Sequence, residues 1–280
     1  MGFEVSLLGV RGSYSSSKSR PSLYGSHTTC ALVQAGSQMI MLDAGSGATN
    51  ADTDRVRGWS GEDFSLLLTH YHHDHVIGFP FMARPAAGTL QVFGPRLGEV
   101  GPEEALRRMV APPLFPVELE MLGPIAFQPF DPSSHSFTLG RGEDAVRVQS
   151  QAVNHPGGAV GYRIEHKGQV FCFIPDIELP NDPSAAFDPE LIAFITGADA
   201  LVIDAAYAVE DFARYIGWGH SHWGQALELA EQAGVRTLLP THVNPSYADE
   251  EIARWEQAAR AKATTVQVEF ARESAIINLS

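Results

Sequence analysis

The sequence predicts a single mixed α/β domain that spans residues 1–280. Short apolar runs rich in β-branched residues recur from one end of the chain to the other, and such runs are typical of strands. Helix-like segments lie between these runs, and the clearest of them, 222–233, has an apolar stripe. Apolar residues make up 44% of the chain and charged residues 19%, which is the composition of a folded protein with a buried core.

The elements follow in order along the chain. Strands are expected at 3–10, 29–34, 38–43, 64–69, 89–93, 146–153, 159–165, 169–174, 199–204, 235–240 and 265–279. Helices are expected at 50–57, 102–110, 188–196, 209–215, 222–233 and 248–262. The helix at 222–233 has the clearest signals, because Ser221 can act as its N-cap and Gly234 stands where it should stop.

The stretch 111–137 is rich in proline and has no regular pattern. Its large apolar side chains, Leu114 and Phe127 among them, need burial, so we expect a covering loop over a small pocket and not a linker. Cys30 and Cys172 stand far apart in separate apolar runs, where buried thiols are expected and a disulfide framework is not.

Composition also limits where the protein acts and what it binds. The chain has no apolar run near the roughly 18 residues of a membrane span and no signal-peptide pattern at its start, so a cytoplasmic protein without membrane contact is expected. The net charge is −14, and no run of basic residues is present. A nucleic-acid partner is therefore not expected, whereas a small anionic substrate held by metal is. A homodimer is compatible with the sequence.

One cluster of side chains carries the strongest chemical signal. His70, His72, Asp74 and His75 follow an apolar strand in the spacing H-x-H-x-D-H. A strand end followed by a tight turn can aim the first two at one point and the last two at a neighbouring point. Imidazole and carboxylate without thiolate suit zinc first, with manganese or iron as alternatives.

Three isolated residues complete this pattern, because His155, Asp176 and His242 each occur where a predicted strand ends. Each alone is weak evidence for a metal ligand. Read with the cluster, they complete two sites: His70, His72 and His155 around one divalent cation, Asp74, His75 and His242 around the other, and Asp176 bridging both.

These residues resemble the metallo-β-lactamase superfamily, and more narrowly its ribonuclease Z and cyclic-phosphodiesterase branch. The similar segments run in order along nearly the whole chain: LLGVRGS, YGSHTTC, MLDAGSG, THYHHDHVIGFPF, NHPGGAVGYRIE, FIPD, LVIDAAY, GWGHS and LPTHVNPSY. The resemblance implies a four-layer αβ/βα sandwich in which helices flank two mixed central sheets. It also implies that the metals lie at the edge that the two sheets share.

The segment GWGHS resembles the motif by which phosphodiesterases of this branch place a histidine against the scissile phosphate, which makes His220 the expected catalytic histidine beside Asp74. Its position before a predicted helix suits an anion, because a helix N-terminus offers free N–H groups. Asp43 is expected to orient a ligand histidine, and Asp204 to do the same near His220 or His242.

The sequence thus predicts a binuclear hydrolase that cleaves a small (cyclic) phosphodiester by attack of a hydroxide that bridges the metals. A thioesterase or lactonase of the same fold is an alternative, since it would share the ligands. A tRNA 3′-processing endoribonuclease is another, although the segment 243–247 lacks the arginine common in that branch and no Gly- and Lys-rich arm is visible. A redox diiron protein is disfavoured, because that class normally has glutamate where His72 stands. A metal-binding scaffold without catalysis is disfavoured, because none of the expected metal ligands is missing.

Overall fold

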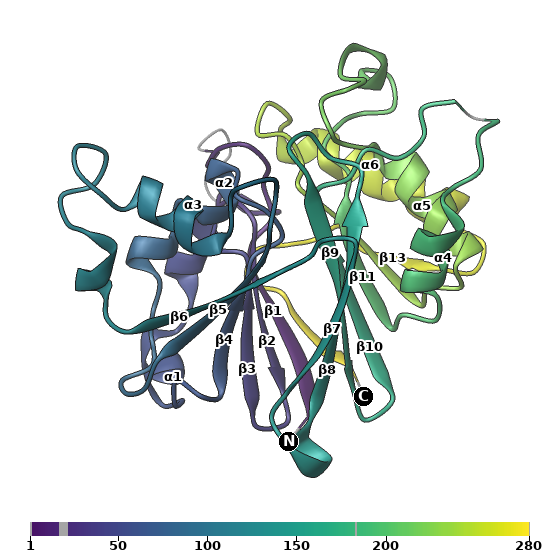
Figure 1. Cartoon of the computed structure of the whole chain (residues 1–280). Helices are drawn as coiled ribbons and strands as arrows, with labels where there is room; N and C mark the ends of the chain where they lie inside the picture. The colour runs from purple at the N-terminus through teal and green to yellow at the C-terminus, as the bar shows by residue number, and fades with distance from the viewer. Residues whose placement is uncertain (1, 17–21, 183, 280) are drawn as a thin grey trace.

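The computed structural model describes residues 2–16, 22–182 and 184–279. Over these residues the strands form two mixed sheets of seven strands each, which pack face to face (Figure 1). Helices cover the outer face of each sheet, so the molecule has four layers in the order helix, sheet, sheet, helix. The predicted αβ/βα sandwich is confirmed.

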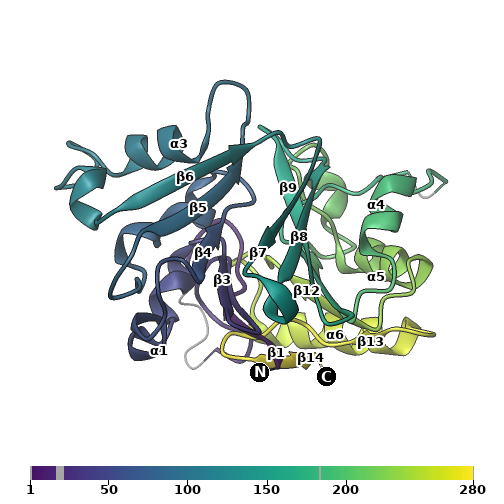
Figure 2. The ribbon, with the colours of Figure 1, turned by 60° about the horizontal axis from the view of Figure 1, so that its bottom comes forward.

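The first sheet has the order β14-β1-β2-β3-β4-β5-β6. Its strands are β1 (Phe3–Gly9), β2 (Cys30–Ala35), β3 (Gln38–Leu42), β4 (Phe64–Leu67), β5 (Leu90–Pro95), β6 (Ile125–Phe130) and β14 (Ile276–Leu279). The pairs from β14 to β3 are antiparallel, and those from β3 to β6 are parallel. Figure 2 shows β14 beside β1, far from β6 at the other side of the sheet. Because β3 and β4 are parallel, their carboxyl ends meet at one edge.

The second sheet has the order β13-β12-β11-β10-β9-β8-β7. Its strands are β7 (Ser134–Leu139), β8 (Val146–Val153), β9 (Ala159–His166), β10 (Gln169–Ile174), β11 (Ala200–Asp204), β12 (Thr237–Thr241) and β13 (Gln267–Val268). The strands β10 to β13 pair in parallel, and those from β7 to β10 are antiparallel. The carboxyl ends of β10, β11 and β12 therefore also share one edge.

The helices divide between the two outer faces (Figure 1). On the first sheet lie α1 (Thr53–Arg57), α2 (His73–Val76) and α3 (Pro102–Met109), and on the second lie α4 (Pro189–Ile195), α5 (Trp223–Gln232) and α6 (Asp249–Lys262). The expected helix at 209–215 is only a short 3₁₀ turn, Phe212–Arg214. Among the residues that the structure describes, no helix has the length and apolarity needed to cross a membrane.

The apolar runs are continuous because central strands are buried on both faces. In β3, Ile40 and Leu42 pack into the core between the sheets, while Met39 and Met41 pack beneath the helices. Cys172 in β10 lies in the core under α4 and α5, and Cys30 lies under the helices of the first sheet. Both cysteines are buried and free, as expected.

Two expectations about the stretch 111–137 are wrong. The stretch 111–137 is not a loop throughout, because it contains all of β6 and the start of β7. Both are edge strands with a half-exposed face, so their apolar pattern is weak, and an edge strand tolerates Pro129. Within the same stretch Leu114 is 78% exposed, so it does not need the burial that was expected of it.

The N-cap of α5 is His222 and not Ser221. The side chain of His222 accepts hydrogen bonds from the backbone N–H groups of Gly224 and Gln225. The Ser221 hydroxyl instead donates to the carbonyl of Ile177, at 2.6 Å, and accepts from the N–H of Leu179. Serine is a common N-cap residue, but the Ser221 hydroxyl is already hydrogen-bonded to the segment after β10.

Glu256 on α6 is a buried carboxylate that joins three segments of the chain. It accepts hydrogen bonds from the Tyr24 hydroxyl at 2.8 Å, from Arg272 Nη2 at 2.6 Å and from the backbone N–H of Phe270 at 3.2 Å. Burial opposes its charge, but the hydrogen bonds from Arg272 and Tyr24 hold the pKa of Glu256 below its usual value. The carboxylate therefore stabilises the fold only while it is ionised.

Replacing Glu256 by alanine should lower the free energy of unfolding at pH 7 by about 3 kcal/mol, because Arg272 and Tyr24 lose a buried partner. Since the folded-state pKa of Glu256 lies below the unfolded value, the wild-type advantage should shrink as pH falls through that folded-state pKa. Urea denaturation at pH 7 and at acid pH measures both effects. Glu250→Ala, an exposed site on the same helix, is the control and should change stability little.

Candidate metal centre

The seven side chains expected to bind metal lie together at the edge where the two sheets meet. The segment after β4 and the short helix α2 supply His70, His72, Asp74 and His75. The segments after β8, β10 and β12 supply His155, Asp176 and His242. Five of the seven are buried, while His72 is exposed and Asp74 half-buried, so the cluster opens to solvent on the side of these two.

A first group consists of His70, His72, His155 and Asp176, whose candidate ligand atoms all lie within 4.8 Å of one another. His155 Nε2 is 3.1 Å from His72 Nδ1 and 3.5 Å from Asp176 Oδ2. His70 Nε2 is 3.8 Å from that same oxygen. Three imidazoles and one carboxylate oxygen thus face a common point.

A second group consists of Asp74, His75 and His242. His242 Nε2 lies 3.1 Å from Asp74 Oδ2 and 3.3 Å from His75 Nε2. The neighbouring carboxylate of Asp176 reaches this group with its other oxygen, since Oδ1 is 3.0 Å from His75 Nε2 and 3.2 Å from His242 Nε2. Each oxygen of Asp176 therefore faces a different group, as a bridging ligand requires.

The nitrogen and oxygen atoms of the cluster are better placed to bind divalent cations than to form hydrogen bonds with one another. His70 Nε2 is buried and has no hydrogen-bond partner within the described residues. At two places imidazole nitrogens face each other, at 3.1 and 3.3 Å, in a region crowded with further imidazoles and carboxylates. A buried nitrogen lone pair without a partner is costly unless a cation accepts it. Nitrogen and oxygen donors without thiolate suit zinc, manganese or iron.

Residues around the cluster orient the histidines. His75 Nδ1 donates to Asp43 Oδ2 at 2.8 Å, which leaves Nε2 directed at the cluster. Asp43 is in turn fixed by the N–H and hydroxyl of Thr69. Burial raises the pKa of Asp43, while His75 and Thr69 oppose that shift. Asp43 lies at φ 56°, a strained conformation of the kind that concentrates at functional sites.

His220 stands beside the cluster and contacts Asp204. The distance from His220 Nδ1 to Asp204 Oδ2 is 2.7 Å, and the ring stacks on that of His242 with centroids 4.8 Å apart. Burial opposes a charge on His220, but the Asp204 carboxylate outweighs it and raises the pKa of His220 to about 9. Of the two histidines left open for Asp204, its hydrogen bond is to His220.

Two residues that touch the cluster, Gly12 and Ser13, were not expected from the sequence to belong to the site. The backbone N–H of Ser13 donates to Asp74 Oδ2 at 2.7 Å. A Cβ on Gly12 would lie 2.4 Å from His242 Nδ1, so only glycine fits there. Both belong to the LLGVRGS segment, and a Gly-Ser pair just beyond the expected strand at 3–10 was the available signal.

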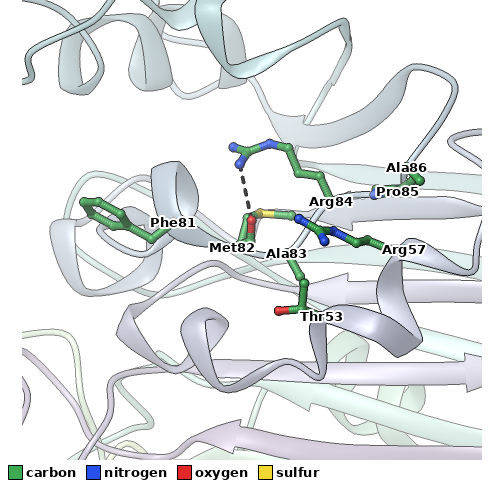
Figure 3. A pocket seen from close by; sticks show the side chains of 8 residues that line it. All are labelled: Thr53, Arg57, Phe81, Met82, Ala83, Arg84, Pro85 and Ala86. Carbon is green, nitrogen blue, oxygen red and sulfur yellow. Dashed lines mark hydrogen bonds between the residues drawn. The ribbon is translucent and has the colours of Figure 1, made fainter.

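A hollow of about 720 Å³ lies elsewhere, lined by residues 81–86 together with Thr53 and Arg57 (Figure 3). None of its lining residues is a histidine or a carboxylate, and Arg84 there donates to the Met82 carbonyl. It is therefore separate from the metal-binding candidates.

The model of the beta-lactamase superfamily domain matches residues 40–243, and the chain belongs to this superfamily. It is a metal-dependent hydrolase of the metallo-β-lactamase fold, and the fold together with the histidine and aspartate groups implies that it binds divalent metal. The resemblance seen in the sequence is thereby confirmed.

Two of the curated relatives are named ribonuclease Z. The protein from Porphyromonas gingivalis is 25% identical, over 80% of this chain and 85% of its own length. That from Bradyrhizobium is 28% identical, over 89% of this chain and 92% of its own. The solved structure of the metallo-beta-lactamase fold protein YhfI from Bacillus subtilis covers 99% of this chain and 100% of its own, with 18% identity and a TM-score of 0.67, which shows a shared fold.

These relatives overturn one expectation. The acidic charge and the lack of a basic run led us to expect no nucleic-acid partner, and this is wrong, because relatives along most of the chain are ribonucleases by name. Net charge describes the whole surface, whereas an RNA end held at a metal centre contacts only a small part of it.

Replacing Gly12 by alanine should weaken metal binding about 10- to 100-fold, because the added methyl group displaces His242. Competition with a chromophoric chelator measures the affinity. Gly2→Ala is the matched control, since nothing lies within 4 Å of the methyl group it adds. Unchanged affinity in Gly12→Ala would contradict this expectation.

Proposed function

We propose that the protein is a binuclear metal-dependent phosphodiesterase. The observation that carries the proposal is the position of His220, which Asp204 holds beside the two ligand groups that share Asp176. We assign His70, His72 and His155 to one cation, Asp74, His75 and His242 to the other, and Asp176 to both. Zinc is the proposed metal.

Each part of the chain has a task in this proposal. Two bound divalent cations would supply charge neutralisation and an activated water near neutral pH. His220 Nδ1 is hydrogen-bonded to Asp204, which leaves Nε2 to contact the phosphoryl oxygens or to give a proton to the leaving alkoxide. Asp43 and the carbonyl of Gly219 hold the rings of His75 and His155 so that their other nitrogens face the cluster.

The proposed substrate is a small, cyclic phosphodiester. A second candidate is the phosphodiester of an RNA 3′ end, as in a tRNA precursor, and the ribonuclease Z relatives favour it. Both reactions break a P–O bond at the same centre, so the ligands do not separate them. A thioester or lactone is the remaining alternative, and neither substrate has a phosphate for His220 to contact.

A substrate panel separates these candidates. We expect protein with about two equivalents of zinc, counted by atomic emission, to hydrolyse bis(4-nitrophenyl) phosphate, with activity lost on chelation and regained with metal. The panel adds a cyclic nucleotide, a tRNA precursor, a thioester and a lactone. Turnover of the thioester or lactone with no turnover of any diester would contradict the proposal.

Replacing His220 by alanine should lower kcat on the diester at least about a hundredfold, as losing one proton donor or charge stabiliser commonly does. Metal content should stay at the wild-type value. His135→Ala, which alters a half-buried histidine on β7, is the control and should keep full activity. A fall in metal content in His220→Ala would instead make His220 a ligand, which its place in a group with Asp176 and His242 allows.

A further inference from the structure

An exposed tryptophan lies on the segment that carries His220. Trp218 is 62% exposed, although large aromatic side chains are normally buried. The segment between β11 and α5, to which it belongs, extends beyond the edge of the second sheet (Figure 1). An exposed aromatic ring next to a catalytic centre is a candidate binding surface.

The backbone around Trp218 packs directly against the metal centre. A Cβ on Gly219 would lie 2.2 Å from Pro156 Cδ and 2.5 Å from His155 Nδ1, so only glycine permits this approach. The Gly219 carbonyl accepts the hydrogen bond of His155 Nδ1 at 2.8 Å. Trp218 is therefore one residue from the group that orients a proposed metal ligand, and two residues from His220.

Glu178 holds this segment in place. Its Oε1 accepts from the backbone N–H of Gly217 at 2.8 Å, and its Oε2 accepts from that of Gly219 at 2.7 Å. Glu178 is itself anchored, because its backbone N–H and carbonyl pair with Asn154, the residue before His155. The two amides that flank Trp218 are thus bound by one carboxylate.

Aromatic packing supports the indole from one side. The rings of Tyr207 and Tyr215 stack with centroids 3.9 Å apart, and Trp218 meets Tyr215 at 5.6 Å and 86°. Tyr207 is also 5.9 Å from the ring of His220. The ring is therefore supported, yet most of it stays open to solvent.

We propose that Trp218 binds the substrate by stacking on a planar ring next to the scissile phosphate, as a nucleobase would, with Glu178 as the positioning residue. This rests on the proposed phosphodiesterase function. Stacking on an aromatic side chain tolerates any base, because every base offers a flat π-face. A ring already held in place loses little conformational freedom on binding.

Two ligands that differ only in the base test the stacking. Adenosine 5′-monophosphate and ribose 5-phosphate are titrated into metal-loaded protein by calorimetry. We expect Trp218→Ala to weaken binding of the nucleotide about tenfold or more and to leave ribose 5-phosphate unchanged. Trp218→Phe keeps a ring and should retain most of the affinity. Phe81→Ala, which removes an exposed aromatic ring on another element, is the control and should change neither.

An equal loss for both ligands, or no loss for either, overturns the stacking proposal. The phosphodiesterase proposal fails separately, if wild-type protein hydrolyses no diester of any kind. Hydrolysis of diesters without a difference between the two ligands overturns the stacking alone.

Hydrogen exchange tests the role of Glu178. In Glu178→Gln one side-chain oxygen is replaced by an amide that cannot accept, so one of the Gly217 and Gly219 amides loses its acceptor. Exchange at that amide should accelerate, and nucleotide affinity should fall with it. Glu228→Gln, on the exposed side of α5, is the control. Unchanged exchange at both glycines overturns the positioning role.

Discussion

The carboxylate of Asp176 is the point on which the site depends. One of its oxygens faces His75 and His242, and the other faces His70 and His155. A buried carboxylate in such a position is tolerable only with positive charge on both sides, because burial alone strongly disfavours it. The surrounding imidazoles hold the pKa of Asp176 well below its usual value despite that burial. The two ligand groups are thus parts of one electrostatic unit.

The sheets place this unit, because parallel strands in each sheet end at one common edge. Backbone strain marks the same edge: Asp43 and His242 both have positive φ, at 56° and 60°, directly after β3 and β12. Such conformations persist where packing around them compensates. Gly12 against His242 and Thr69 on Asp43 provide that packing.

The elements that could be predicted from the sequence are those with a strong local pattern of apolar residues. The buried strands and the helices at 222–233 and 248–262 were recognisable because their apolar residues recur at a fixed period. The edge strands β6 and β7 were missed, since one half-exposed face and a proline leave no such period. The convergence of His155, Asp176 and His242 was predicted, but the contacts of Gly12, Ser13 and Glu178 were not. The hydrogen bonds of Ser13 and Glu178 involve backbone N–H groups, which every residue except proline offers, and the Gly12-Ser13 pair was only a weak local signal.

The proposed ligands are supplied by both halves of the chain: His70 to His75 follow strands of the first sheet, and His155, Asp176 and His242 follow strands of the second. Neither half alone therefore offers a complete coordination sphere. During synthesis, capture of the second cation has to wait until the strand before His242 has left the ribosome and joined its sheet. Bound metal would then join the two halves after both sheets have formed, and it would resist their separation.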